Sequence, residues 1–213
     1  MKLQLALDRM TKENCIDLIE ETKAYVDWIE VGTGVIKEYG VSFLAELKAA
    51  YPESTLVADM KTCDAGKHES EQAFRAGADV TTVMAFSADQ TIKDSLLMAE
   101  IYGKRVMVDL LNVQNETRLK ELSNLGVDLV GLHYGKDMQK KKGAEMDELF
   151  SLVKEYPDFD IAVAGGISID KIKTLSEYEP QIVIVGSALT KAENPKAEAE
   201  AIKGAMKVEG NYC

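Results

Sequence analysis

Short β-rich apolar runs recur along the chain at intervals of roughly 25 residues, and a stretch with helical periodicity follows each run. This alternation is typical of consecutive βαβ units and therefore predicts a parallel sheet. The eight expected strands are 3–8, 26–31, 54–59, 79–84, 104–109, 128–133, 160–165 and 181–186. The expected helices include 15–25, 41–50, 69–76, 92–102 and 146–156.

Eight consecutive units favour closure of the sheet into a (β/α)8 TIM barrel. An open, doubly wound sheet is the alternative, because its buried strands read equally as continuous apolar runs. Gly77, Gly103 and Gly126 each precede an expected strand, where a helix commonly ends in a left-handed conformation. The chain of 213 residues has no Pro/Gly/Ser-rich linker, so we expect one domain, 1–213.

Composition excludes several classes of protein. The net charge of −11 would repel nucleic acid, so an anionic substrate must be captured by local groups. No apolar run approaches the ~18 to 20 residues of a membrane helix, and no signal peptide is visible, so we expect a cytoplasmic protein without a membrane partner. Cys15, Cys63 and Cys213 are odd in number and widely spaced, which predicts free thiols.

Polar side chains stand where the expected strands end, at Asp8, Glu30, Asp59, Asp109 and His133. An Asp after a strand is often only a turn former or a helix cap. In a parallel barrel, however, all these ends meet at one mouth, where catalytic groups are found. Two carboxylates about 4 Å apart repel by up to ~4 kcal/mol at an effective dielectric near ~20. We therefore expect Lys61 and a hard divalent ion, Mg²⁺, to neutralise them.

The two histidines differ in position. His133 ends a strand, and a histidine side chain at that place suits proton transfer near neutral pH, whereas His68 lies near a helix start and is expected at the surface. The charged stretch 139–143 follows the sixth strand and is read as a solvated loop, with a phosphate-touching lid as the alternative.

A phosphate site is expected after the last two strands. Gly165, Gly166 and Gly186 would allow backbone N–H groups to approach a ligand, Ser187 follows them, and Ser168 is expected to cap a helix. Glycines at strand ends are also ordinary turn residues.

The segment 58–66, ADMKTCDAG, carries a DxKxxD motif. With LQLALD, VDWIEVGTG, VMVDLLNV, AVAGGIS and IVIVGSALT, it resembles the orotidine-monophosphate decarboxylase superfamily and, within it, the 3-hexulose-6-phosphate synthases. The resemblance covers essentially the whole chain in order, which makes it far more specific than any single motif.

This resemblance implies a Mg²⁺-dependent aldol reaction that joins formaldehyde to ribulose 5-phosphate through an enediolate. It implies that Glu30 and Asp59 bind the metal and that Asp8 and Lys61 contact substrate hydroxyls. His133 would be the acid/base, and Asp64 would reach the site of the neighbouring subunit in a homodimer with shared active sites. We count Asp109 among the catalytic residues. Without the resemblance, Asp64 would be read as the cap of a helix beginning near residue 65.

Three alternatives stay open. The 3-keto-L-gulonate-6-phosphate decarboxylases resemble the chain in the same motifs, but typically have Glu where Asp109 stands, Arg near Lys136 and Thr where Ala164 stands. Related sugar-phosphate decarboxylases usually carry Arg in place of Ser187. A ribulose-phosphate epimerase would resemble a chain with two strand-end histidines, and only His133 qualifies. A non-catalytic phosphosugar-binding barrel would need neither His133 nor Lys61.

Overall fold

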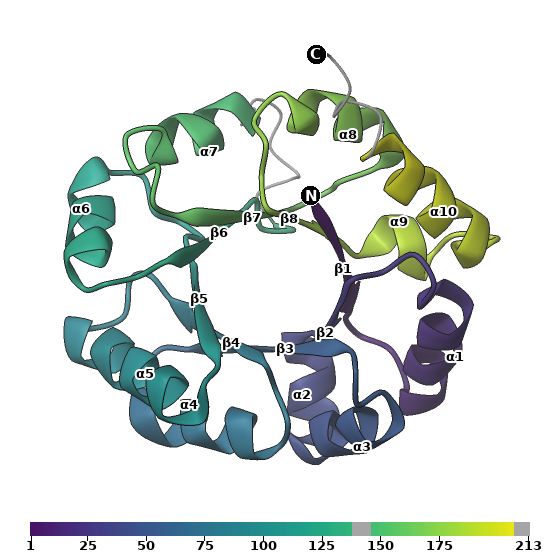
Figure 1. The fold of residues 1–213 in the computed structure, drawn as a ribbon, viewed down its shortest axis with the longest axis horizontal. Coiled ribbons are helices and arrows are strands. Elements are labelled where there is room, and N and C mark those ends of the chain that lie inside the picture. The colour runs from purple at the N-terminus through teal and green to yellow at the C-terminus, as the bar shows by residue number, and fades with distance from the viewer. Residues whose placement is uncertain (138–145, 207–213) are drawn as a thin grey trace.

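The computed structural model describes residues 1–137 and 146–206, and its eight strands form a closed barrel in the order β1 to β8 (Figure 1). Every neighbouring pair is parallel, and β1 pairs with β8 to complete the circle. The strands are β1 (Lys2–Leu7), β2 (Trp28–Val31), β3 (Thr55–Thr62), β4 (Val80–Met84), β5 (Arg105–Asp109), β6 (Leu129–His133), β7 (Asp160–Ala164) and β8 (Ile182–Val185). The predicted barrel is confirmed, and the open sheet is wrong.

Helices surround the barrel on its outside (Figure 1). They are α1 (Lys12–Thr22), α2 (Thr33–Tyr39), α3 (Ser42–Ala50), α4 (Gly66–Arg75), α5 (Asp89–Tyr102), α6 (Glu116–Asn124), α7 (Met146–Val153), α8 (Ile169–Ser176), α9 (Ser187–Thr190) and α10 (Pro195–Ala205). Helices α1, α4 and α5 begin three residues earlier than predicted. Apolar periodicity marks only the packed face of a helix, whereas its first turn is polar and is set by capping, as where Thr11 accepts a hydrogen bond from the Asn14 N–H.

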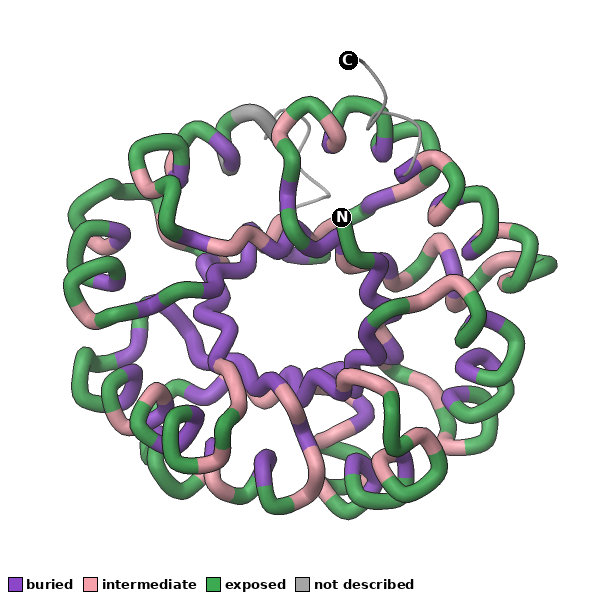
Figure 2. The backbone as a smooth tube through the Cα atoms, viewed as in Figure 1, coloured by how far each residue is buried: buried purple, intermediate pink, exposed green. Residues whose placement is uncertain are grey.

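Alternate strand residues feed two separate cores. Leu3, Leu5 and Leu7 of β1 point outwards and pack with the helices. Seven inward residues form a second cluster inside the barrel, which we call the apolar floor: Trp28, Val57, Val80, Met107, Leu129, Ala162 and Ile182. Each is the first or third residue of its strand. The floor therefore fills the start of the barrel and leaves the strand ends to polar groups (Figure 2 shows the buried barrel wall).

Three glycines end helices as expected. Gly77, Gly103 and Gly126 have φ values of +97°, +62° and +83°, in the left-handed region that favours glycine. The Cys15 and Cys63 thiols are free, as predicted. Cys213 and the charged stretch 139–143 lie outside the described residues. Among the helices of the described part, none has the length and apolar character needed to cross a membrane.

Candidate active site

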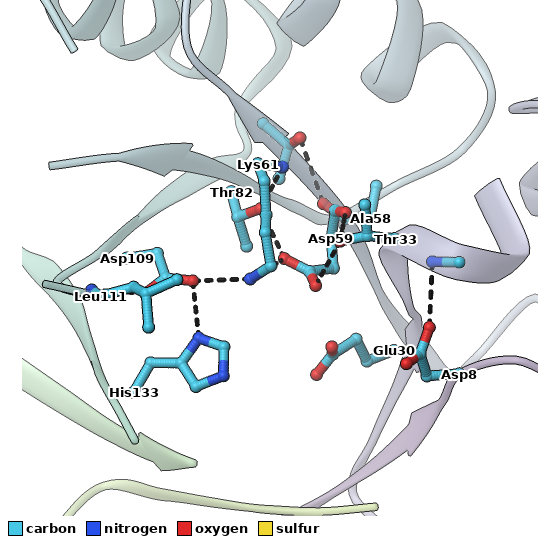
Figure 3. A network of polar contacts seen from close by, with 12 residues as sticks. Asp8, Glu30, Thr33, Ala58, Asp59, Lys61, Thr82, Asp109, Leu111 and His133 are labelled. Atoms are coloured by element: carbon cyan, nitrogen blue, oxygen red, sulfur yellow. Dashed lines mark hydrogen bonds and ion pairs between the residues drawn. The ribbon is translucent and has the colours of Figure 1, made fainter. Parts of the chain in front are cut away.

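A chain of polar contacts links three strands at the barrel mouth (Figure 3). The Lys61 ammonium lies 2.7 Å from Asp109 Oδ2 and 3.2 Å from Asp59 Oδ1. His133 Nδ1 lies 3.0 Å from the same Asp109 oxygen. We call these four residues the Lys61 cluster. The strand ends thus converge as predicted, and a lysine lies between two of the carboxylates.

Lys61 reaches this position through an irregularity in β3. The strand was expected to end at Asp59, which is wrong: it continues to Thr62, with a register shift against β4 between Ala58 and Thr62. Lys61 has a φ of +49°, and its N–H donates to the Thr82 hydroxyl at 2.9 Å. A bulge of this kind redirects a side chain, and here the Lys61 side chain enters the mouth.

Asp59 is held by two hydroxyls that the sequence did not single out. Thr82 Oγ donates to Asp59 Oδ1 at 2.8 Å, and Thr33 Oγ lies 2.8 Å from Asp59 Oδ2. Thr82 stands two residues before the end of β4, on the face that points into the barrel, so strand alternation could have identified it. Thr33 begins α2, and no strand pattern marks it.

Asp109 is a buried carboxylate that stays ionised. Burial alone would raise its pKa, but the hydrogen bond and charge of His133, together with Lys61, lower the pKa of Asp109 to about 2. Its other oxygen accepts from the Leu111 N–H at 2.9 Å. Because an ionised carboxylate only accepts, His133 carries its proton on Nδ1 and leaves Nε2 facing the mouth. Burial also disfavours the charge of Lys61, yet Asp59 and Asp109 outweigh burial and raise the pKa of Lys61.

Glu30 lies across the mouth from His133 and is 9% exposed. Burial and the charges of Asp59 and Asp109 raise the pKa of Glu30 to about 8, against the hydrogen bond from Gln4 and the charge of Lys61. The negative charge of Glu30 is therefore only partly neutralised by its neighbours, and a second carboxylate, Asp59, lies near it. Such a pair of carboxylates is suited to binding a divalent cation. Within residues 1–137 and 146–206 no three His, Cys, Asp or Glu side chains form a metal-binding group. Glu30 and Asp59 thus fit an ion of the Mg²⁺ type, which commonly binds one or two carboxylates and takes its other oxygens from water and substrate.

Asp8 follows β1 and lies at the same mouth, separate from the Lys61 cluster (Figure 3). Its carboxylate accepts from the Gly34 N–H at 2.9 Å and pairs with Arg9 at 2.9 Å. A Cβ on Gly34 would lie 2.5 Å from Asp8 Oδ1, so only glycine allows this approach. Gly34 is therefore a further residue that shapes the site. The Gly-Thr-Gly sequence that follows β2 could have identified it.

Asp64 does not cap the helix that follows it. The N-cap of α4 is Ala65, in a left-handed conformation with φ +51°, and no side chain caps the helix. The capping interpretation is therefore wrong. Asp64 is exposed and makes no hydrogen bond or ion pair within the described part of the chain. His68 is exposed on α4, as predicted.

The expected phosphate loops follow β7 and β8, and β8 pairs with β1 in the barrel. Gly165 and Gly166 have φ values of +121° and +61°, and a Cβ on Gly165 would lie 2.4 Å from the Tyr134 carbonyl oxygen. Gly186 precedes α9, whose first residue is the exposed Ser187. Ser168 occupies the N-cap of α8, as predicted, although its side chain makes no capping hydrogen bond. Because β7 pairs with β6, which ends in His133, and β8 pairs with β1, these loops lie between the His133 and Asp8 sides of the mouth.

Comparisons with known proteins agree with this arrangement. The family model described as "Orotidine 5'-phosphate decarboxylase / HUMPS family" matches residues 1–202. A 3-hexulose-6-phosphate synthase of Bacillus subtilis is 36% identical over 204 residues, covering 95% of this chain and 97% of the relative. The crystal structure of the 3-hexulose-6-phosphate synthase from Salmonella typhimurium has a TM-score of 0.94 at 37% identity, covering 97% of this chain and 98% of the other.

Similar solved structures also include the 3-keto-L-gulonate-6-phosphate decarboxylases, the alternative considered above. A 3-keto-L-gulonate-6-phosphate decarboxylase from Vibrio cholerae has a TM-score of 0.84 at 27% identity, with 96% of each chain covered. The predictions of an enzyme and of the superfamily are confirmed by these relatives. From the barrel, the strand-end cluster and these likenesses together, it follows that the chain belongs to the orotidine 5'-phosphate decarboxylase / HUMPS family.

Proposed function

We propose that this chain is an aldolase that joins formaldehyde to D-ribulose 5-phosphate, giving D-arabino-hex-3-ulose 6-phosphate. The observation that carries the proposal is the Lys61 cluster beside Glu30, in a chain 36% identical to a protein named 3-hexulose-6-phosphate synthase. The cluster provides a cation for a developing negative charge and an imidazole for proton transfer, which are the groups that an enediolate mechanism needs.

The substrate would lie with its phosphate at Gly165, Gly166, Gly186 and Ser187 and its ketone towards Lys61. Glu30 and Asp59 would hold Mg²⁺, which supplies Lewis-acid polarisation of substrate oxygens when bound. Asp8 would accept a hydrogen bond from a substrate hydroxyl.

The chemistry would begin at His133. Its Nε2 takes a proton from the carbon next to the ketone, and the electron pair of that C–H bond forms the enediolate. Lys61 stabilises the negative oxygen, and Asp109 holds both Lys61 and His133 in place. The enediolate carbon then bonds to the formaldehyde carbon, the C=O pair moves to the formaldehyde oxygen, and that alkoxide takes up a proton.

Decarboxylation of 3-keto-L-gulonate 6-phosphate is the second candidate, because loss of CO₂ would leave a similar enediolate. Asp109 and Ala164 favour the aldolase, since the decarboxylases typically have Glu and Thr there. Asp109 is also short enough to contact Lys61 and His133 through one oxygen, and a longer Glu would have to shift both partners.

The purified protein should be assayed with each substrate set before and after exhaustive chelation. We expect aldol kcat/KM to exceed decarboxylation kcat/KM, chelation to abolish turnover and Mg²⁺ to restore it. Asp59→Asn should lose most activity and keep its fold, whereas the exposed Asp158→Asn should keep both. Full activity after chelation would refute the metal assignment, and a larger decarboxylation kcat/KM would select the second candidate.

A further inference from the structure

Gln4 is a polar residue in an apolar part of the barrel. It is fully buried in β1, and its neighbours in register are Trp28 on β2 and Ile184 on β8. Trp28 belongs to the apolar floor, and Ile184 packs against it. A leucine or methionine would suit these surroundings better, because burial of an amide costs free energy unless its polar atoms are paired.

Only half of the Gln4 amide is paired. Its nitrogen donates to Glu30 Oε2 at 2.6 Å, across 26 positions of sequence. Its oxygen is buried and has no hydrogen-bond partner in the described residues. An unpaired buried acceptor lowers the stability of the folded state. The stability of the barrel therefore does not explain a glutamine at this position. The hydrogen bond to Glu30 explains it.

We infer that Gln4 is the positioning residue that orients the Glu30 carboxylate for a divalent cation. The inference rests on the proposed function in one respect, because it takes Glu30 as a metal ligand. A glutamate side chain has several rotatable bonds, and a hydrogen bond to one oxygen restricts the carboxylate to a single orientation. In Figure 3 that orientation directs the Glu30 carboxylate into the mouth.

The neutrality of the donor matters as much as its position. A lysine or arginine at this place would also hold Glu30, but its charge would cancel the negative charge that attracts a cation. Lys61 already neutralises the Asp59 and Asp109 side of the mouth, where it lies 3.2 Å and 2.7 Å from their carboxylates. Gln4 fixes Glu30 through a neutral donor, so no further positive charge competes with the ion for this carboxylate.

The test compares Gln4→Met with wild type and with Ile184→Met. Methionine matches the length of glutamine without a donor, and Ile184 is the neighbour of Gln4 that packs on the floor without a polar contact. The dissociation constant of Mg²⁺ is measured by calorimetry on the full chain, and thermal unfolding is followed in its absence. Loss of such a supporting partner typically weakens metal binding roughly 10- to 100-fold.

We expect that weakening in Gln4→Met, with an unfolding temperature in the absence of Mg²⁺ at or above that of wild type, and wild-type affinity in Ile184→Met. Raising the Mg²⁺ concentration should restore kcat in Gln4→Met. Gln4→Asn keeps an amide inside the barrel but is one methylene too short, so it should show the same weakening if the Met variant fails to fold.

Three results would overturn the inference. Wild-type Mg²⁺ affinity in either Gln4 variant would leave the proposed function standing and remove the role of Gln4. A lowered unfolding temperature with unchanged affinity would assign Gln4 a structural role. If wild type itself binds no Mg²⁺, the metal assignment in the proposed function fails, and the inference falls with it.

Discussion

Asp109 joins the two residues to which we assign the chemistry. One of its oxygens contacts both the Lys61 ammonium and the His133 ring, and the other is held by a backbone N–H. The pKa of about 2 keeps this carboxylate charged throughout the neutral range. Its charge therefore fixes the position of a cation and the tautomer of a base at the same time.

Asp109→Asn should keep the fold and lose activity. The amide has nearly the same shape, but it removes the charge that holds Lys61 and His133. We expect kcat to fall by roughly 10²- to 10⁴-fold, the usual contribution of positioned acid–base catalysis. Steady-state kinetics measure the loss, and circular dichroism checks the fold.

The matched control is Asp128→Asn, in which an exposed carboxylate loses its ion pair with Arg105 at the start of β5, remote from the strand ends. A kcat within twofold of wild type in Asp109→Asn would contradict the role given to Asp109.

At the scale of elements, Asp79 connects four segments near the start of the barrel. It precedes β4, and its carboxylate pairs with Lys48 of α3 at 2.9 Å and with Lys104 before β5 at 2.6 Å. The Leu56 N–H of β3 also donates to it at 2.9 Å. Burial would raise the pKa of Asp79, but the hydrogen bonds from Lys104, Leu56 and Lys48 outweigh burial and lower it.

This shift makes a pH-dependent contribution to stability. Because the folded pKa lies below the unfolded value of ~3.9, the contribution is present above ~pH 3.9 and is lost as the pH falls through the folded pKa. Asp79→Asn should lower the free energy of unfolding by about 1.5 to 3 kcal/mol at pH 7, from the loss of charged hydrogen bonds. Urea unfolding should show a smaller difference from wild type at pH 3.

Asp158→Asn is the control, since Asp158 is exposed, and it should change the free energy of unfolding by no more than ~0.5 kcal/mol. A difference between Asp79→Asn and wild type that does not shrink at low pH would contradict the ionic origin of the effect.

At the scale of the whole molecule, we propose a homodimer in which Asp64 enters the partner's mouth. Two features support this proposal. Asp64 is exposed and has no partner in the described chain, and Phe86, in the loop after β4, is 59% exposed. The Ser87 hydroxyl donates to the Thr62 carbonyl oxygen at 3.3 Å, which ties the loop of Phe86 to the end of β3. An exposed aromatic residue on a fixed loop is typical of interface cores.

Subunit mixing tests the shared site. Asp64→Asn and Lys61→Ala should each be nearly inactive, but half of the molecules in a randomised equal mixture are heterodimers with one intact site of two. Roughly a quarter of wild-type activity should therefore return. The control mixture of Lys61→Ala with Asp59→Asn should recover nothing, because those residues serve the same subunit's site. No recovery in the first mixture would show that Asp64 acts within its own subunit.

The sequence by itself determined the barrel, the strand-end positions of Glu30, Asp109 and His133, and the helix-ending glycines. Each depends on local rules: strand alternation, helical period and the conformational freedom of glycine. Only the tertiary structure decided the bulge that turns Lys61 inwards, the hydroxyls that hold Asp59, the outward position of Asp64 and the contact of Gln4 with Glu30. Lys61 and Asp109 are 48 positions apart, and contacts over such separations depend on the register of neighbouring strands, which no local pattern encodes.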